Sequence, residues 1–333
     1  MIENLLNPSK YPDKPDNVKL VQTHISYVFI SRNLVYKIKK PVNFGFLDFT
    51  SLEKRKYFCN REIILNSRLS PDIYIKTVPV LKTNNDYFYD GENGEIVDYA
   101  VVMKRIDEQF LVKNLLKQDK IKTNDFKVIA EHLFKFHNKY PASIETAKEN
   151  SSIEMLKFTT DENFSQTEQY IGITIAESGF KNLKSYTNDF YIKNKELLNK
   201  RIADSKIKEC HGDLHLEHVG IKDNKAFFLD CIEFNERFRI IDVANEIAFL
   251  AMDLDYNGYK DFSKDFIDFY ISISNDTEII TLINFYKIYR AYVRGKVTSF
   301  LIDDKNIPEN QKKAIISTAK NYFTLAESYL EES

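Results

Sequence analysis

Apolar and polar positions follow two different periods along this chain. Up to about residue 103, short runs of apolar residues alternate with polar ones, a pattern typical of half-buried β-strands. The predicted strands are residues 18–22, 27–30, 34–38, 76–81 and 97–103, with a hairpin loop between the last two. We expect these runs to form a small five-stranded antiparallel sheet.

One helix interrupts the strands. Thr50 or Ser51 can cap its start, and it stops before Pro71. Residues 1–17 are polar and contain three prolines, so we expect an extended arm there.

Beyond residue 105 the apolar residues recur at helical spacing, apart from a strand at residues 226–229. The pattern predicts an α+β protein with a sheet-rich part over residues 1–105 and a helical part over residues 106–333. The predicted helices are residues 124–140, 182–204, 240–255, 261–274, 278–300 and 309–331, with further helix within 150–180.

The composition narrows the class of protein. Of 333 residues, 43% are hydrophobic and 29% charged, as in ordinary globular proteins. A formal net charge of -2 argues against nucleic acid or an anionic membrane as partner. No run is long enough to span a membrane, and the N-terminus does not resemble a signal peptide. Three cysteines without a Cys-x-x-Cys pair fit a reducing, cytoplasmic location.

The chemistry concentrates in the stretch 210–218, which reads Cys-His-Gly-Asp-Leu-His-Leu-Glu-His. A second acid, Asp230, comes directly after the predicted strand at residues 226–229. Two such acids suit phosphoryl transfer: one, Asp213, orients a hydroxyl and accepts its proton, and the other holds a divalent metal ion on the phosphates.

This arrangement resembles the catalytic loop of the aminoglycoside phosphotransferase family, a branch of the protein-kinase-like fold. The resemblance covers about residues 18–325 and implies a two-lobed kinase-like fold. It is closest to an uncharacterised bacterial branch, some of whose members carry a second nucleotide-binding domain. No Gly-x-x-x-x-Gly-Lys-Ser/Thr stretch occurs here, so we expect the single-domain form. The matching stretches are residues 23–26, 36–41, 45–49, 230–234, 241–243, 248–254 and 289–294.

The resemblance implies roles for the residues of the loop. Asp213 corresponds to the catalytic carboxylate and Asp230 to the metal-binding aspartate that bridges magnesium to the phosphates. His211 corresponds to a structural histidine that fixes the backbone around the metal-binding aspartate. Asp242 resembles a buried aspartate that braces the catalytic loop.

A lysine near the end of the third strand is the expected phosphate contact. Because side chains alternate between the two faces of a strand, Lys37 and Lys39 lie on the same face. We favour Lys37 as the phosphate contact because it follows Val-Tyr. Glu62, in the helix, is the expected partner of this lysine. The alternative interpretations are an edge strand guarded by lysines and a solvated glutamate.

The nucleotide contacts follow from the same resemblance. The chain has no Gly-x-Gly-x-x-Gly, so the turn at residues 23–26 is expected to hold phosphate through backbone amides and the hydroxyl of Ser26. The backbone of residues 101–105, including Met103 and Arg105, is expected to meet an adenine ring. ATP and GTP are both compatible with this pattern.

His218 departs from the family. An asparagine metal ligand is usual five residues after the catalytic aspartate, and this chain has a histidine. Imidazole is a poor ligand for magnesium and suits manganese or zinc better. The resemblance implies Mg²⁺ as the ion, and His218 makes Mn²⁺ or reduced activity the alternative.

The acceptor site is open to two interpretations. Arg290 and Arg294 share a helix face and would favour an anionic acceptor. Glu233 and Asp253 belong to an acidic set that would favour a cationic one. A third interpretation is that the arginines and acids pair with one another.

The function that we predict is an ATP-dependent O-phosphotransferase acting on a small hydroxylated molecule. The alternative is a kinase-like nucleotide-binding or regulatory protein with weak or no catalysis, for which His218 is the support. No Ala-Pro-Glu segment follows Asp230, which argues against a protein kinase. The expected partners are a nucleotide and the acceptor, without nucleic acid or membrane, and the sequence leaves the oligomeric state and the acceptor open.

Overall fold

The computed structural model describes residues 1–304 and 307–331. Contacts between Cα atoms divide the chain into two compact units. Unit 1 comprises Met1–Asp119, Glu217–Asp223 and Phe227–Glu236, and unit 2 comprises Lys120–Leu216, Asn224–Ala226 and the chain from Arg237 onward. This division differs from the predicted boundary after residue 105, because the chain up to Asp119 and the segment around Asp230 pack with the sheet.

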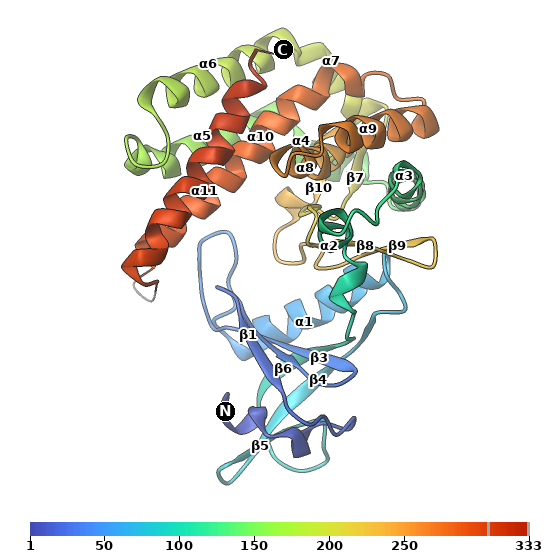
Figure 1. Ribbon diagram of the computed structural model, residues 1–333, viewed down its shortest axis with the longest axis vertical. Helices are drawn as coiled ribbons and strands as arrows, with labels where there is room; N and C mark the ends of the chain where they lie inside the picture. The colour runs from blue at the N-terminus through green and yellow to red at the C-terminus, as the bar shows by residue number, and fades with distance from the viewer. Residues whose placement is uncertain (305–306, 332–333) are drawn as a thin grey trace. The chain divides into compact units, whose positions relative to one another are not determined.

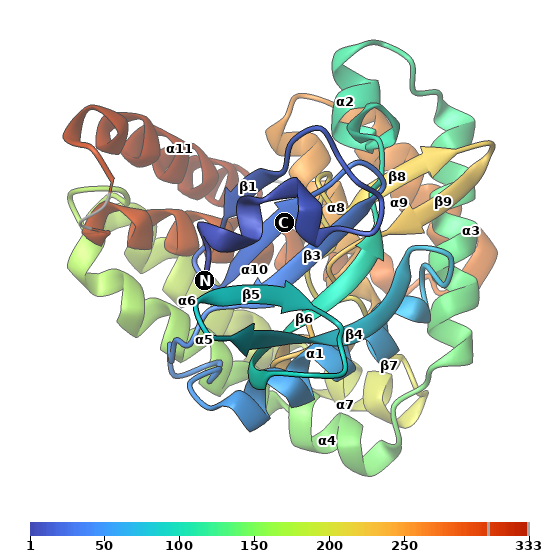
Figure 2. The ribbon, with the colours of Figure 1, turned by 90° about the horizontal axis from the view of Figure 1, so that it is seen from below.

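The sheet of unit 1 is antiparallel throughout (Figures 1 and 2). Within the described ranges it has six strands, in the order β1-β2-β3-β6-β4-β5. Their bounds are Lys19–Gln22, Ser26–Ile30, Leu34–Lys39, Tyr74–Thr83, Asp86–Tyr89 and Glu95–Lys104 for β1 to β6. The predicted five-stranded sheet lacked β5, a four-residue edge strand that pairs with β4 inside the predicted loop. Short edge strands have too few positions to show a period.

Helix α1 (Leu52–Ser67) packs against β4 and β6. The hydroxyl of Ser51 accepts a hydrogen bond from the Lys54 amide and so caps the helix where the sequence predicted. This cap sets the residue at which α1 begins.

The N-terminal arm is folded, not extended as predicted. It forms two 3₁₀ turns, Asn4–Leu6 and Pro8–Lys10. Leu5 and Tyr11 are buried in the core of unit 1, where the Tyr11 ring packs edge-on against Tyr36. The prolines limit this segment to turns, but burial of these two apolar side chains still favours packing over an extended arm.

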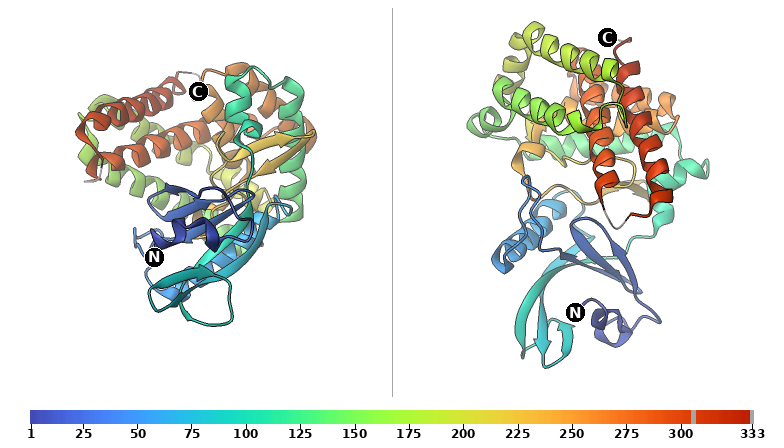
Figure 3. Two further views of the ribbon diagram at one scale, coloured as in Figure 1. Left: turned by 60° about the horizontal axis from the view of Figure 1, so that its bottom comes forward. Right: turned by 90° about the vertical axis from the view of Figure 1, so that its left-hand side faces the viewer.

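Unit 2 is helical. Helices α10 and α11 lie side by side, as both views in Figure 3 show. All but the last residue of α8 are buried, so this helix forms the centre of the unit. The helices of unit 2 are α3 (Thr123–Lys139), α4 (Ile144–Ser151), α5 (Ile153–Thr167), α6 (Glu177–Lys193), α7 (Lys195–Ala203), α8 (Val243–Tyr256), α9 (Lys260–Ser274), α10 (Ile279–Phe300) and α11 (Glu309–Ser328).

Two short strand pairs flank the predicted catalytic loop in the sequence. Strands β7 (Ile207–Glu209) and β10 (Ile240–Asp242) pair in unit 2, and β8 (Val219–Lys222) and β9 (Lys225–Phe228) form a hairpin. The remaining short helix, α2 (Val112–Lys117), belongs to unit 1. Two predicted helices are corrected: residues 182–204 are divided between α6 and α7, and residues 240–242 are a strand. None of the helices in the described parts of the chain is long and apolar enough to cross a bilayer.

Candidate active site

Two lysines and three carboxylates form a connected network in unit 1. Lys37 Nζ lies 3.0 Å from Glu62 Oε1 and 2.5 Å from Asp230 Oδ1. Lys39 Nζ lies 2.6 Å from Glu62 Oε2 and also pairs with Glu233. Glu62 and Lys39 are 0% and 1% exposed. Ionised groups this deeply buried are retained only when they are paired, so the network fixes β3, α1 and the segment after β9 against one another.

Strand geometry explains why both lysines reach Glu62. Lys37 and Lys39 alternate onto one face of β3, the face that α1 covers. The expected ion pair between Lys37 and Glu62 is present, but Lys39 shares the same carboxylate. The Lys39 ammonium also lies 4.9 Å from the centre of the Phe49 ring. Lys37 is the lysine that contacts Asp230, so the two lysines have different surroundings.

Asp230 has an unusual backbone conformation. Its φ is 62°, in the left-handed region that residues other than glycine rarely adopt. The Asp230 amide donates to the hydroxyl of Tyr74, and the Cys231 amide donates to Asn66 Oδ1. Ser70 exchanges hydrogen bonds with the backbone of Phe228. Strained residues of this kind persist where neighbouring contacts hold them, and they cluster at functional sites.

Charge within the network keeps Asp230 ionised. Burial favours the neutral acid, but Lys37 and His218 hold the pKa of the Asp230 carboxyl well below its usual value. For Glu233 burial prevails over Lys39, and its pKa is raised. Burial opposes the charge of Lys37, yet the nearby carboxylates, Asp230 first, raise its pKa.

Residues 210–216 of the predicted catalytic loop lie in unit 2 and are held by α8 and α10. Glu246 accepts hydrogen bonds from the amides of His211, at 2.5 Å, and Gly212, at 3.0 Å. Arg290 Nη1 donates to the Gly212 carbonyl at 3.1 Å. Inside the loop, the Asp213 amide donates to His211 Nδ1. Gly212 has a φ of 87°, which favours glycine, so the turn that presents Asp213 depends on this residue.

The carboxylate of Asp213 remains partly accessible. Its side chain is 35% exposed, and Oδ2 lies 3.5 Å from Nε2 of the buried His215. Asp253 accepts a hydrogen bond from the Leu216 amide at 2.9 Å, which fixes the far end of the loop. Hydrogen bonds therefore hold the loop backbone, while the Asp213 side chain stays partly exposed.

The role predicted for Asp242 is wrong. Asp242 caps α8 through the Ala244 amide, and both of its oxygens accept from Arg201. Glu246, one helical turn further on, is the carboxylate that contacts the loop. Its pKa is raised to about 7, because burial outweighs Arg290 and the two loop amides.

The turn before β2 does not offer the amides that we expected. The amides of Ile25 and Ser26 both donate to Thr23 Oγ1, at 3.3 and 3.0 Å. Ser26 is 0% exposed, and within the described residues its hydroxyl has no hydrogen-bond partner. The predicted phosphate contact through Ser26 therefore does not fit this conformation.

Backbone amides in the segment expected to bind adenine, residues 101–105, already donate hydrogen bonds within unit 1. The Lys104 amide donates to the Ile73 carbonyl, and the Arg105 amide donates to the Asn33 carbonyl. The Arg105 guanidinium donates to the Ser31 carbonyl. Met103 packs in an apolar cluster of unit 1 that also contains Ile106 and Leu229. This cluster supplies apolar surface for a base, but the Arg105 amide is not free for one.

Three of the four predicted acceptor residues have structural partners. Glu233 pairs with Lys39, and Asp253 holds Leu216. Arg290 donates to Asn245 and Gly212 and lies 4.6 Å from the centre of the Phe249 ring. These contacts give the three residues structural roles, and their part in an acceptor site stays a prediction. Arg294 makes no ion pair with any described residue and remains a candidate.

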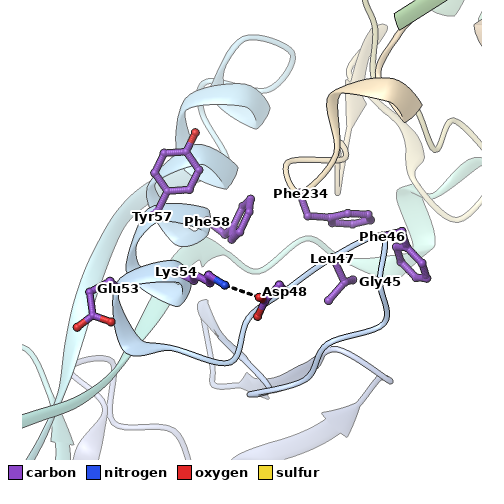
Figure 4. Close-up of a pocket in the computed structure, with 9 residues that line it drawn as sticks. All are labelled: Gly45, Phe46, Leu47, Asp48, Glu53, Lys54, Tyr57, Phe58 and Phe234. Carbon is purple, nitrogen blue, oxygen red and sulfur yellow. Dashed lines mark hydrogen bonds and ion pairs between the residues drawn. The ribbon is translucent and has the colours of Figure 1, made fainter. Parts of the chain in front are cut away.

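One pocket of unit 1 is separate from this network. It measures about 520 Å³, and four of the nine residues that line it are aromatic, as Figure 4 shows. Its wall includes Phe46, Phe58 and Phe234, with Asp48 and Lys54 paired at its edge. Neither Lys37 nor Asp230 lines it, so we do not assign it to the nucleotide.

Several residues around the site were given no role in the sequence analysis, and Lys39 was the less favoured of two lysines there. Lys39, His215 and Glu246 each contact a predicted site residue, and Tyr74 holds the Asp230 backbone. The signal for Lys39 was present, because it shares a strand face with Lys37. The other contacts join residues far apart in sequence, which no local pattern indicates.

No family model matches the chain. Curated relatives include uncharacterised proteins of Mycobacterium bovis and Mycobacterium tuberculosis, each 29% identical over 278 residues. The match covers 83% of this chain and 53% of each relative, so the chain spans about half the length of the curated relatives it matches.

Solved structures are similar over almost the whole chain. A choline kinase from Cryptosporidium parvum aligns with a TM-score of 0.57 at 12% identity, covering 99% of this chain and 95% of the kinase. A choline/ethanolamine kinase family protein from Mesorhizobium loti aligns with a TM-score of 0.53 at 11% identity, covering 97% and 92%. The chain has the protein-kinase-like fold. The predicted fold class, an antiparallel-sheet part followed by a helical part, is thereby confirmed.

Within the kinase-like fold, the site residues are divided between the two units. Lys37, Glu62 and Asp230 belong to unit 1, and His211 and Asp213 belong to unit 2. Their roles in nucleotide binding and catalysis stay predictions, and so does metal binding by His218, which lies in unit 1.

Proposed function

We propose that the protein is an ATP-dependent O-phosphotransferase that acts on a small hydroxylated acceptor. The observation that carries the proposal is the built geometry of the loop: His211, Glu246 and Arg290 fix its backbone, while the Asp213 carboxylate remains accessible. A carboxylate positioned this way can orient a hydroxyl and accept its proton.

The reaction follows from this assignment. The acceptor oxygen forms a bond to the γ-phosphorus of ATP, and the bond from that phosphorus to the β,γ-bridging oxygen breaks. Asp213 accepts the hydroxyl proton, and the products are ADP and a phosphate monoester. Lys37 contributes a cation for the nucleotide phosphates, held in place by Glu62.

The partly exposed carboxylate of Asp230 supports the proposal of a divalent cation in unit 1. Two ammonium groups face three carboxylates, and the Asp230 side chain is 46% exposed. Oxygen ligands of this kind suit Mg²⁺ or Mn²⁺. Asp230 would hold the ion, which would neutralise phosphate charge when bound.

A nucleotide-binding or regulatory protein with little catalysis is the second candidate. The amides of Ser26 and Arg105, expected to bind nucleotide, are both engaged by other backbone and side-chain groups. This observation favours weaker or altered nucleotide binding.

Two aspartate variants test the proposal. Asp213→Asn should abolish ATP turnover while the ATP affinity stays near that of the wild type, because the ground-state complex does not depend on this carboxylate. Asp230→Asn should weaken metal-dependent ATP binding as well as turnover. Turnover and thermal shift with ATP and either Mg²⁺ or Mn²⁺ are the measurements. Wild-type turnover in both variants would remove the assignment, and ATP binding without turnover in the wild type would favour the regulatory protein.

A further inference from the structure

Two arginines one turn apart on α10 have different surroundings. Arg290 is 5% exposed, and it donates to both Asn245 and Gly212. Arg294 forms no ion pair with any residue in the described ranges, and its Nε is buried without a hydrogen-bond partner there. A cation with a buried donor and no carboxylate partner is costly to keep in a folded protein.

The surroundings of Arg294 orient its guanidinium. The group lies 5.5 Å from the centre of the Tyr322 ring on α11, and this ring stacks on Tyr256 with centroids 3.8 Å apart. The Tyr322 side chain also forms a hydrogen bond with this guanidinium, whereas the buried Nε of the same planar group has no partner among the described residues. That geometry suits an oxyanion with two oxygens, such as a carboxylate or a phosphate.

Arg294 also interacts electrostatically with the predicted catalytic loop. Burial would lower its pKa, but Tyr322, Asp213 and Asp253 raise it, so the group is a permanent cation within the field of Asp213. Asp253 uses one oxygen to hold the Leu216 amide. An anion brought near Asp213 would be repelled by both carboxylates, and Arg294 is the cation that would offset this repulsion.

We propose that Arg294 binds an oxyanion of the acceptor, so that the preferred acceptors are hydroxylated carboxylates or phosphate monoesters. This inference rests on the proposed function. It selects one of the two acceptor classes that the sequence left open, because Arg294 forms no ion pair with any described residue, whereas Glu233 is paired with Lys39.

The test uses binding without nucleotide, so that its outcome does not depend on turnover. Glycerol 3-phosphate, glycerate and glycerol are titrated into the wild type and followed by thermal shift and calorimetry. The two anions should bind at millimolar concentrations or below and glycerol should not. Arg294→Met should weaken anion binding at least tenfold, and Arg294→Lys should fall between, because lysine keeps the charge but loses the planar fork.

Arg32→Met is the matched control, because Arg32 has a 52% exposed side chain in unit 1 and should leave binding unchanged. Equal binding of glycerol and the anions, no anion binding by the wild type, or undiminished binding by Arg294→Met would each overturn the inference. If ATP affinity with Mg²⁺ falls in Arg294→Met as steeply as anion affinity, the oxyanion belongs to the nucleotide and the acceptor assignment is wrong. Failure of the proposed function has a different signature, which is anion binding by a wild type that never turns over ATP.

Discussion

Lys39 Nζ lies 2.6 Å from Glu62 Oε2, on the carboxylate whose other oxygen lies 3.0 Å from Lys37. One glutamate thus holds two lysines of the same strand. Only Lys37 also contacts Asp230, while Lys39 also contacts the buried Glu233. The two lysines should therefore differ in what their removal damages.

Lys39→Met should mainly destabilise the fold. The substitution leaves Glu62 and Glu233 buried together without the cation between them, and breaking a buried pair in this way costs about 3–5 kcal/mol. Urea unfolding of the variant and the wild type measures the loss. A free energy of unfolding within about 0.5 kcal/mol of the wild type, as for an ordinary surface substitution, would contradict the structural role.

Lys37→Met should mainly damage nucleotide binding. Its other partner, Asp230, is half exposed, so water can replace part of the lost interaction and the stability loss should be smaller than for Lys39→Met. ATP affinity and turnover should fall clearly, because the variant loses the cation assigned to the phosphates. If Lys37→Met binds and turns over ATP normally while a folded Lys39→Met does not, the phosphate contact is Lys39.

Glu246 should make stability depend on pH near neutrality. Its pKa in the folded protein is about 7, above the usual 4.5, so the folded state binds this proton more tightly than the unfolded state. The contribution of Glu246 to stability is therefore greatest below pH 4.5 and declines as the pH rises toward 7, by an amount on the order of 1–3 kcal/mol.

The Glu246→Gln variant isolates this contribution, because it cannot titrate. Its free energy of unfolding should change less between pH 5 and pH 8, by about the amount just given, than that of the wild type. The variant also places an NH₂ group against a loop amide, so it should be less stable at both pH values and less active. Parallel pH profiles for the two proteins would show that Glu246 does not titrate in this range.

His218→Asn should change the metal preference if His218 binds the ion. Wild-type turnover should then be faster with Mn²⁺ than with Mg²⁺, and the asparagine should shift the preference toward Mg²⁺, since a hard oxygen donor replaces imidazole. ATP turnover with each metal gives the ratio. An unchanged ratio would mean that His218 is not a ligand.

Local patterns in the sequence determined most of the elements and the candidate chemistry. The alternation of side chains in β3 placed Lys37 and Lys39 on one face, the Ser51 cap located the start of α1, and the stretch around Asp213 marked the candidate catalytic loop. These features depend on residues close together in the chain, whose preferences act before any tertiary contact forms.

Tertiary structure decided which polar groups pair. The sequence could not show that Glu246, and not Asp242, holds the loop, because both are acids at the start of α8 and only packing against Arg201 and the loop separates them. It likewise could not separate Arg290 from Arg294, which share a helix face. A buried charge takes whichever partner the packed chain brings within reach, and that choice depends on residues distant in sequence.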